Sequence, residues 1–132
     1  MISVQRTIKK SVNLSGHGLH TGVHVDLVIH PAPENHGLVF RRVDLEGQPT
    51  VKADVDNVTD TSRSTTIEHN EAKVGTIEHA LSALAGLEIC NALIDINGPE
   101  LPILDGSARQ YVDALNAAGI VNQQAERGIL EI

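Results

Sequence analysis

The first part of the chain alternates apolar and polar residues, which is the pattern of β-strands with one buried face. Residues 3–14 are rich in strand-forming residues, and in residues 23–29 every second position is Val, Leu or Ile. The stretch SGHGLHTG separates these segments, and Pro31 and Pro33 follow the second one. Because proline cannot donate to a sheet, the pattern predicts two strands joined through the glycine-rich stretch, with the second ending at the prolines.

Shorter strand-like runs come next. LVFRRV follows the loop sequence PENHG and precedes the turn sequence DLEGQP, so it is predicted to be a third strand. Residues 51–55 and 63–67 have the composition of two further short strands. Hairpins are therefore expected throughout this half of the chain.

The apolar repeat then lengthens from two residues to between three and four. Ile77, Leu81 and Leu84 recur at i, i+4 and i+7, which places one apolar face on a helix. Thr76 is a suitable N-cap and Gly86 a suitable terminator for this helix. A helix beginning at Ile77 and ending by Gly86 is the prediction.

One more strand, a loop and a second helix complete the pattern. Residues 89–96 predict a strand that is buried on at least one face, and NGPELPILDGS predicts a rigid loop with two prolines. Residues 107–118 predict a second amphipathic helix. GILEI at the end fits either the beginning of a strand or a frayed terminus.

Hairpins followed by helices predict a two-layer α+β sandwich, with both helices on one face of a mostly antiparallel sheet. The length of 132 residues suits a single domain over residues 1–132. Phe40 and Tyr111 are the only aromatic residues, so the core must be aliphatic. Cys90 is the only cysteine, which excludes an internal disulfide, and within CNALIDI it is predicted to be a small buried apolar residue.

Charge and hydropathy exclude several classes of partner. A net charge of −7 opposes binding to nucleic acid or to an anionic membrane, and base-stacking aromatic residues are almost absent. No segment approaches the roughly 20 apolar residues of a membrane span, and the start has no apolar stretch of signal-peptide length. We therefore expect a cytoplasmic protein without nucleic-acid partners.

The tetrapeptide TIEH occurs twice, at residues 66–69 and 76–79. The first copy ends a strand-like run and leads into a polar turn, so Glu68 and His69 are predicted to be solvated turn residues. The second copy opens a helix. Glu78 and His79 therefore occupy its first turn, outside the apolar stripe.

This first-turn pair has the residue types of a metal-dependent hydrolase. A metal held by His79 could keep a water that Glu78 deprotonates, and the free N–H groups of the helix end would favour developing negative charge. From spacing alone the pair fits an ordinary helix end more often, because a Glu in the first turn is favoured by the helix dipole.

A complete metal site within the chain is not expected. H-E-x-x-H and H-x-x-E-H motifs are absent. His30 and Glu34 have helical spacing, but the prolines between them prevent a helix. The cluster H-x2-H-x3-H formed by residues 17–24 lies in a glycine-rich loop, with His24 on the polar face of a strand.

The order of motifs resembles the UDP-3-O-acyl-N-acetylglucosamine deacetylase family, whose zinc enzymes commit lipid A synthesis in Gram-negative bacteria. The resemblance runs over residues 5–120 and rests on SGHGLHTG, HPAPENHGLVFRR, DTSRSTT, TIEHALSALAGL and NGPELPILDGSA. It implies the first of two α+β domains, with a fold like domain 2 of ribosomal protein S5. It also implies a UDP-linked acylated glucosamine as the substrate.

The resemblance carries roles for individual residues. The family's T-[IV]-E-H motif matches residues 76–79, which makes His79 a zinc ligand and Glu78 the general base. The family takes its other two zinc ligands, from an H-x3-D motif, and its general-acid His from the second domain. This sequence contains none of them, so the chain is expected to be inactive on its own.

Two further stretches match positions that line the family's substrate site. These are Leu19 and His20 in GLHTG, and Arg63 and Ser64 in DTSRSTT, where the family often has Cys in place of Ser64. A hydrogen bond that orders the loop explains His20 as well as a substrate contact does.

Other matched residues have structural explanations. Asp105 and Ser107 are explained by a turn and a helix start. Arg41 and Arg42 could reach an anionic substrate, but neighbouring arginines on a strand point to opposite faces and are more often solvated, which is the expectation here. The alternative for the whole chain is a non-catalytic binding or scaffold module of the same fold, with Glu78 and His79 as helix-end residues.

Overall fold

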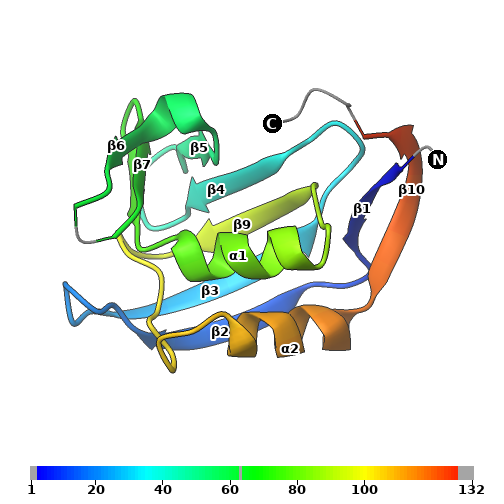
Figure 1. Ribbon diagram of the computed structural model, residues 1–132. Helices are drawn as coiled ribbons and strands as arrows, with labels where there is room; N and C mark the ends of the chain where they lie inside the picture. Colours follow the sequence, from blue (N-terminus) through cyan, green and yellow to red (C-terminus); the bar gives the residue numbers. More distant parts are fainter. Residues whose placement is uncertain (1–2, 63, 128–132) are drawn as a thin grey trace.

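The computed structural model describes residues 3–62 and 64–127, and this part of the chain forms strands in three sheets and two α-helices (Figure 1). The strands are β1 (Val4–Ile8), β2 (Val12–His17), β3 (His24–Pro31), β4 (Leu38–Arg42), β5 (Thr50–Lys52), β6 (Val58–Asp60), β7 (Thr66–His69), β8 (Ala72–Gly75), β9 (Ala92–Ile96) and β10 (Ile120–Glu126). The helices are α1 (Glu78–Gly86), α2 (Arg109–Ala118) and the short 3-10 helix η1 (Val55–Asn57). Of the helices in these described ranges, none is long and apolar enough to cross a membrane.

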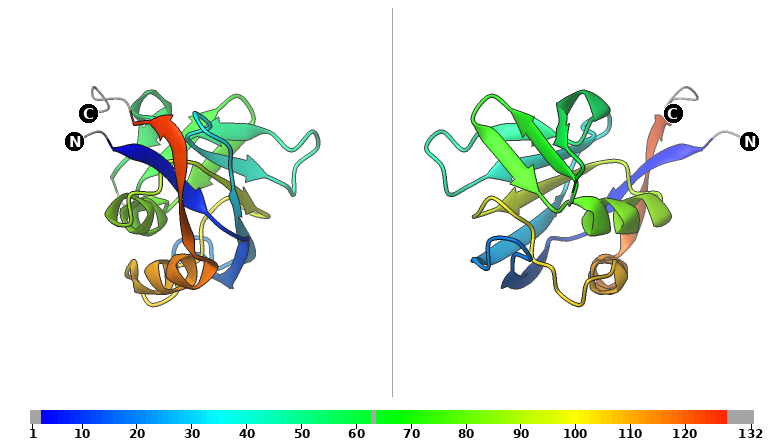
Figure 2. Two further views of the ribbon diagram at one scale, coloured as in Figure 1. Left: turned by 90° about the vertical axis from the view of Figure 1, so that its right-hand side faces the viewer. Right: turned by 60° about the vertical axis from the view of Figure 1, so that its left-hand side comes forward.

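The largest sheet has five strands in the order β2-β3-β9-β4-β5, and all its neighbouring pairs are antiparallel except β4 and β9. On β3 the predicted alternation is confirmed, because Val25, Leu27 and Ile29 are buried whereas His24 and Asp26 are exposed. Both α-helices cover one face of this sheet, as Figure 1 and Figure 2 show. The predicted two-layer α+β sandwich is therefore confirmed, while its closer assignment to the S5 type remains a prediction.

The core between the layers is aliphatic, as the composition requires. Ile, Leu, Val and Ala provide nearly all of the buried cluster, and Tyr111 and Phe40 are its two aromatic members. Ile77 and Leu84 of the α1 segment are fully buried, and Leu81 packs against the core at its edge. The predicted helical stripe thus holds α1 on the sheet.

The described residues form two smaller sheets, β6-β7-β8 and β1-β10, and the second of these departs from the sequence-based prediction. Residues 3–14 form β1 and β2 rather than one strand, because the chain turns at Lys9 and Lys10, and β1 leaves the main sheet to pair with β10. The sequence pattern did not reveal β10, since VNQQAE is mostly polar and half-exposed. The GILEI segment, for which a strand beginning or a frayed terminus was predicted, lies outside the described residues.

Other element boundaries also shift. The strand predicted over residues 51–55 is the shorter β5, followed by η1, and the strand predicted over residues 63–67 is β7, which begins at Thr66. The strand predicted over residues 89–96 begins only at Ala92. The first predicted helix does end at Gly86, but the left-handed residue beyond it is Glu88, with φ 58°.

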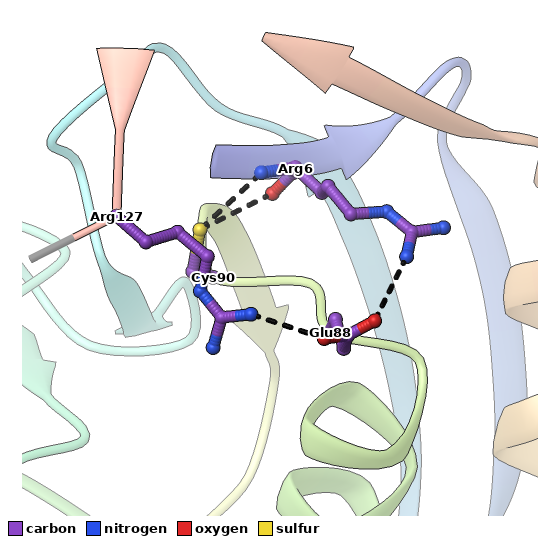
Figure 3. Close-up of polar contacts among 4 residues, drawn as sticks. All are labelled: Arg6, Glu88, Cys90 and Arg127. Carbon is purple, nitrogen blue, oxygen red and sulfur yellow. Dashed lines mark hydrogen bonds and ion pairs between the residues drawn. The ribbon is translucent and has the colours of Figure 1, made fainter. Parts of the chain in front are cut away.

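Figure 3 shows how Glu88 joins three parts of the chain. Its carboxylate lies 3.5 Å from a guanidinium nitrogen of Arg6 on β1 and 3.2 Å from one of Arg127 beyond β10. The half-buried thiol of Cys90 packs beside them, where Sγ accepts the Arg6 N–H at 3.3 Å. Cys90 is therefore packed against the β1 backbone, although it is less completely buried than predicted.

Candidate functional site

The two TIEH copies lie in different environments. The first is β7, which turns at Asn70, with φ 54°, into an antiparallel hairpin with β8. Its Glu68 and His69 are exposed, which confirms that they are solvated residues beside a turn. In the first copy, Glu68 and His69 therefore point to solvent, whereas Ile67 is buried in the core.

The second copy surrounds the start of α1. Glu78 begins the helix, and its Oε1 accepts a hydrogen bond from the Thr65 N–H at 3.1 Å. His79 is half-buried, and within the described ranges its imidazole has no hydrogen-bond partner. Burial raises the pKa of the nearby Tyr111 phenol, and the negative charge of Glu78 raises it further. One carboxylate and one unpaired imidazole thus share the first turn of a helix that is packed on the core.

Thr76 does not cap this helix, contrary to the prediction. Its backbone is left-handed, with φ 57°, and its hydroxyl donates to Glu100 Oε2 at 2.5 Å. The N-cap position is instead occupied by Ile77, which makes no side-chain cap hydrogen bond. The Thr76 hydroxyl therefore binds Glu100, in the loop before α2, and not the start of α1.

Glu100 connects the separate stretches of the site. It is only 3% exposed, and its carboxylate accepts the N–H groups of His20 at 3.1 and 3.2 Å and of Thr21 at 3.0 Å, in addition to the Thr76 hydroxyl. Burial alone would raise the pKa of Glu100, but the hydrogen bonds from Thr76, Thr21 and His20 outweigh it and hold the pKa below its ordinary value. The carboxylate is therefore an ionised anchor.

A pocket of about 280 Å³ lies over this anchor. His20 and Thr21 from the β2–β3 connection line it, together with Ser64, and Lys73 of β8 adds a cation. Thr76 and Glu100 also line the pocket, which places it beside the segment leading into α1.

The structure brings some predicted substrate residues together. His20 and Ser64, which are far apart in sequence, line the same pocket. Leu19 directly precedes His20 in the chain, and its side chain is 57% exposed. Arg63 lies outside the described residues. The loop-ordering hydrogen bond expected of His20 is made by its main-chain N–H, which leaves the imidazole free of partners in the described part of the chain.

The described residues do not complete a metal site. Among them, no three His, Cys, Asp or Glu side chains gather to hold an ion. His17 and His24 are cross-strand neighbours with ring centroids 5.2 Å apart, and His30 is held between Ser11 and Asp95. His79 has no partner for its imidazole among the described residues and shares the first turn of α1 with Glu78, whereas the corresponding His69 lies on an exposed hairpin beside Glu68.

The arginines of β4 are paired rather than solvated, which corrects the prediction. Arg41 forms a two-point contact with Asp95, at 2.7 and 2.9 Å. Arg42 is 7% exposed and forms a similar fork with Asp44, while also donating to the Lys73 carbonyl. The two side chains do lie on opposite faces of the sheet, but carboxylates on neighbouring segments satisfy each one.

Asp105 and Ser107 have the structural roles that were predicted. Asp105 Oδ1 accepts the N–H and the hydroxyl of Ser107, and Ser107 Oγ in turn accepts the N–H of Arg109, the first residue of α2. The hydrogen bond from the Ser107 hydroxyl is the main cause that lowers the pKa of Asp105, and the one from the Ser107 N–H adds to it. These residues shape the turn into α2.

A second pocket, of about 330 Å³, contains none of the predicted site residues. Gln5, Asn35 and Asn91 line it, but their amides bond to one another and to neighbouring main chain. These groups join β1 to the loops beside β4 and β9. The side chains of Gln5 and Asn91 in this pocket therefore serve to connect neighbouring parts of the fold.

Comparisons with known proteins show which family the sequence matches. The sequence profile of the family described as UDP-3-O-acyl N-acetylglycosamine deacetylase matches residues 5–132. A bifunctional enzyme LpxC/FabZ from Bacteroides thetaiotaomicron is 52% identical over 92% of this chain and 26% of that protein.

Two single-function relatives show the same pattern. A UDP-3-O-acyl-N-acetylglucosamine deacetylase from Legionella pneumophila is 49% identical, and one from Thioalkalivibrio sulfidiphilus is 47% identical. Each match covers 97% of this chain and 42% of the relative. The chain therefore spans less than half the length of these relatives.

Proposed function

Because this chain belongs to the UDP-3-O-acyl N-acetylglycosamine deacetylase family, we propose that it is the amino-terminal domain of a zinc-dependent amide hydrolase. The proposed substrate is a UDP-linked acylated glucosamine, which the whole enzyme deacetylates in the cytoplasm during lipid A biosynthesis. A second domain of the same enzyme is the expected partner.

The observation that supports this proposal most is the place of Glu78 and His79. They start a helix that packs on the core, and the segment before them lines the same pocket as His20 and Ser64. Residues from three separated parts of the chain thus gather around one hollow. The proposed substrate positions are Leu19, His20, Arg63 and Ser64.

His79 fits zinc as one ligand, since its imidazole is free of hydrogen bonds within the described residues. It does not make a site alone, because a catalytic zinc needs about three protein ligands. The remaining ligands are proposed to come from the second domain. When bound, zinc supplies a Lewis acid that lowers the pKa of a water molecule.

Glu78 is proposed to act as the general base. It takes a proton from the water that attacks the acetamide carbonyl and holds that proton at its carboxylate. The hydrogen bond from the Thr65 N–H to Oε1 orients the carboxylate, since it ties the side chain to the segment that leads into β7. Attack of the water oxygen forms a C–O bond at the carbonyl carbon. The C–N bond then breaks as its nitrogen takes up a proton, proposed to come from the general-acid histidine of the second domain, and acetate and the free amine are released.

The repeated tetrapeptide provides a matched test. Glu78→Ala and His79→Ala in the full-length protein should each reduce deacetylation by about 100-fold or more. Glu68→Ala and His69→Ala change the same letters at an exposed hairpin and should leave both activity and folding intact. Circular dichroism of all four variants checks the fold. Undisturbed turnover in the first pair would remove the catalytic proposal and favour a binding or scaffold module.

The isolated 132-residue chain should not deacetylate the substrate, with or without added zinc. The reason is the ligand count, because a catalytic zinc needs about three protein ligands and no three candidate side chains gather among the described residues. A turnover assay with the purified chain checks this. Zinc-dependent deacetylation by that chain would refute the division of the site between two domains.

A further inference from the structure

Thr76 has a backbone conformation that its residue type disfavours. Its φ of 57° is left-handed, a region that is strained for a β-branched residue. Only contacts that over-determine the conformation keep such a residue there. The strain lies one residue before Ile77 and two before Glu78, directly at the entry to the proposed catalytic turn.

The contact that holds Thr76 is the buried carboxylate of Glu100. The Thr76 hydroxyl is 2.5 Å from Oε2, and both residues are nearly inaccessible, at 3% exposure each. The backbone on either side of Glu100 is also attached to β8. Gly75 N–H donates to the Pro99 carbonyl at 2.8 Å, and Leu101 N–H donates to the Gly75 carbonyl at 3.1 Å.

The same carboxylate fixes the loop on the other side of the pocket. It accepts the N–H groups of His20 and Thr21, which follow Leu19 in the chain. Gly18 approaches so closely that a Cβ there would lie 2.3 Å from Glu100 Oε1. Both walls of the pocket are therefore attached to one buried group.

We propose that Glu100 and Thr76 are a pair of positioning residues, which together set the orientation of the α1 turn carrying Glu78 and His79 relative to the loop carrying Leu19 and His20. This inference rests on the proposed function. Glu100 is not assigned a catalytic role, because its carboxylate is buried and already accepts four hydrogen bonds from the loop and Thr76.

A positioning role predicts a specific change in kcat, whereas an ordinary stabilising contact would change only the stability of the fold. Removing the Thr76 hydroxyl leaves the N–H groups of His20 and Thr21 bonded to Glu100. Substrate binding by that loop should therefore change little. The first turn of α1 loses its tether, however, and a displacement of about 1 Å at a catalytic group costs about 100-fold in rate. The expected signature is a lower kcat with KM nearly unchanged.

The test uses four variants of the full-length, metal-loaded protein. Thr76→Ala removes the hydroxyl and Thr76→Ser keeps it. Thr76→Gly removes the hydroxyl together with the backbone strain, so it folds even where alanine is poorly tolerated. Thr7→Ala is the matched control, because Thr7 is also buried, at 7% exposure, and its hydroxyl bonds to Asn91 O and Ala32 N rather than to the segment that leads into α1.

We expect kcat to fall by about 10- to 100-fold in Thr76→Ala and Thr76→Gly. Thr76→Ser should recover most of the rate, and Thr7→Ala should lower the melting temperature while kcat stays as in the wild type. A loss of rate in Thr7→Ala equal to that in Thr76→Ala would show only a general effect of stability and overturn the proposal. Wild-type kcat in folded Thr76→Gly would likewise overturn the positioning role.

Hydrogen exchange in the metal-free protein gives a readout that does not depend on activity. The Ile77 N–H bonds to the Thr65 carbonyl at 3.3 Å, and it should exchange faster in Thr76→Ala but not in Thr76→Ser. A wild-type protein without deacetylase activity would overturn the proposed function instead. The exchange measurement would then decide alone, and unchanged exchange at Ile77 in Thr76→Ala would overturn the positioning pair.

Discussion

Identical residues acquire different chemistry from their backbone surroundings. Glu68 and Glu78 each follow a Thr-Ile dipeptide, but Glu68 lies on an exposed hairpin and Glu78 starts a helix, where Thr65 orients its carboxylate. The sequence alone could predict this difference, because Asn70 indicates a turn after one copy and an apolar stripe follows the other. It could not reveal Glu100, since a glutamate between two prolines has no periodicity that marks it as buried.

At the residue scale, the close approach of Gly18 to Glu100 can be tested directly. Gly18→Ala should lower stability by about 1 to 3 kcal/mol, because the new Cβ would lie 2.3 Å from Glu100 Oε1 and 2.6 Å from Thr21 Oγ1. Thermal unfolding measures the change. Gly86→Ala is the control, because a Cβ at Gly86 meets nothing within 4 Å and alanine is the better helix former. Equal stability of the two variants would contradict the tight loop packing.

At the scale of elements, the helices and the central strands could be predicted from the spacing of apolar residues, whereas the pairing of the outlying strands β1 and β10 could not. The stripe of α1 and the alternation of β3 were predicted because both bury one face in the same core. The strand β10 and the separation of β1 from β2 were missed. Their pairing is a contact across almost the whole chain, and polar residues such as Gln123 give no local signal for it.

The loop between β9 and α2 is held by the second helix. The buried Tyr111 hydroxyl donates to the Pro102 carbonyl at 3.1 Å. Tyr111→Phe should therefore destabilise the fold by about 1 kcal/mol, since one buried hydrogen bond is lost with little change in packing. Chemical unfolding with urea measures this free energy. No change in the unfolding midpoint would mean that the hydroxyl bond does not help to hold the loop.

Asp95 on the main sheet should make the stability of the fold depend on pH in the acid range. Burial alone would raise the pKa of Asp95, but hydrogen bonds from Arg41 and His30 outweigh it and hold the pKa below its ordinary value. Stability from this carboxylate is therefore present above the unfolded-state pKa of about 3.9 and is lost as pH falls through the lower folded-state pKa. Asp95→Asn should lower the melting temperature at pH 7, and the difference from the wild type should shrink below about pH 4.

The control for this pH dependence is the exposed Asp113 on α2. Asp113→Asn should change the melting temperature little across the same range, as is usual for surface substitutions. A wild-type advantage over Asp95→Asn that grows as the solution is acidified would have the wrong sign for a carboxylate with a lowered pKa.

At the scale of the whole molecule, the sandwich brings the residues of one pocket together, but the described residues do not form a complete metal site. The layers place the start of α1, the β2–β3 connection and the segment before β7 around one pocket, with Glu100 beneath it. Within the described part of the chain no set of metal ligands is complete. Counting ligands in the sequence gives the same expectation, and the sharing of a zinc site with a second domain stays a prediction.

The most direct test measures turnover and bound zinc in the same preparation of full-length Glu78→Gln. Glutamine keeps the shape of the side chain but cannot take a proton, and His79 remains available as a ligand. We predict zinc content equal to the wild type with turnover reduced by about 100-fold or more. Turnover close to the wild-type value at full zinc occupancy would contradict the assignment of Glu78 as the base.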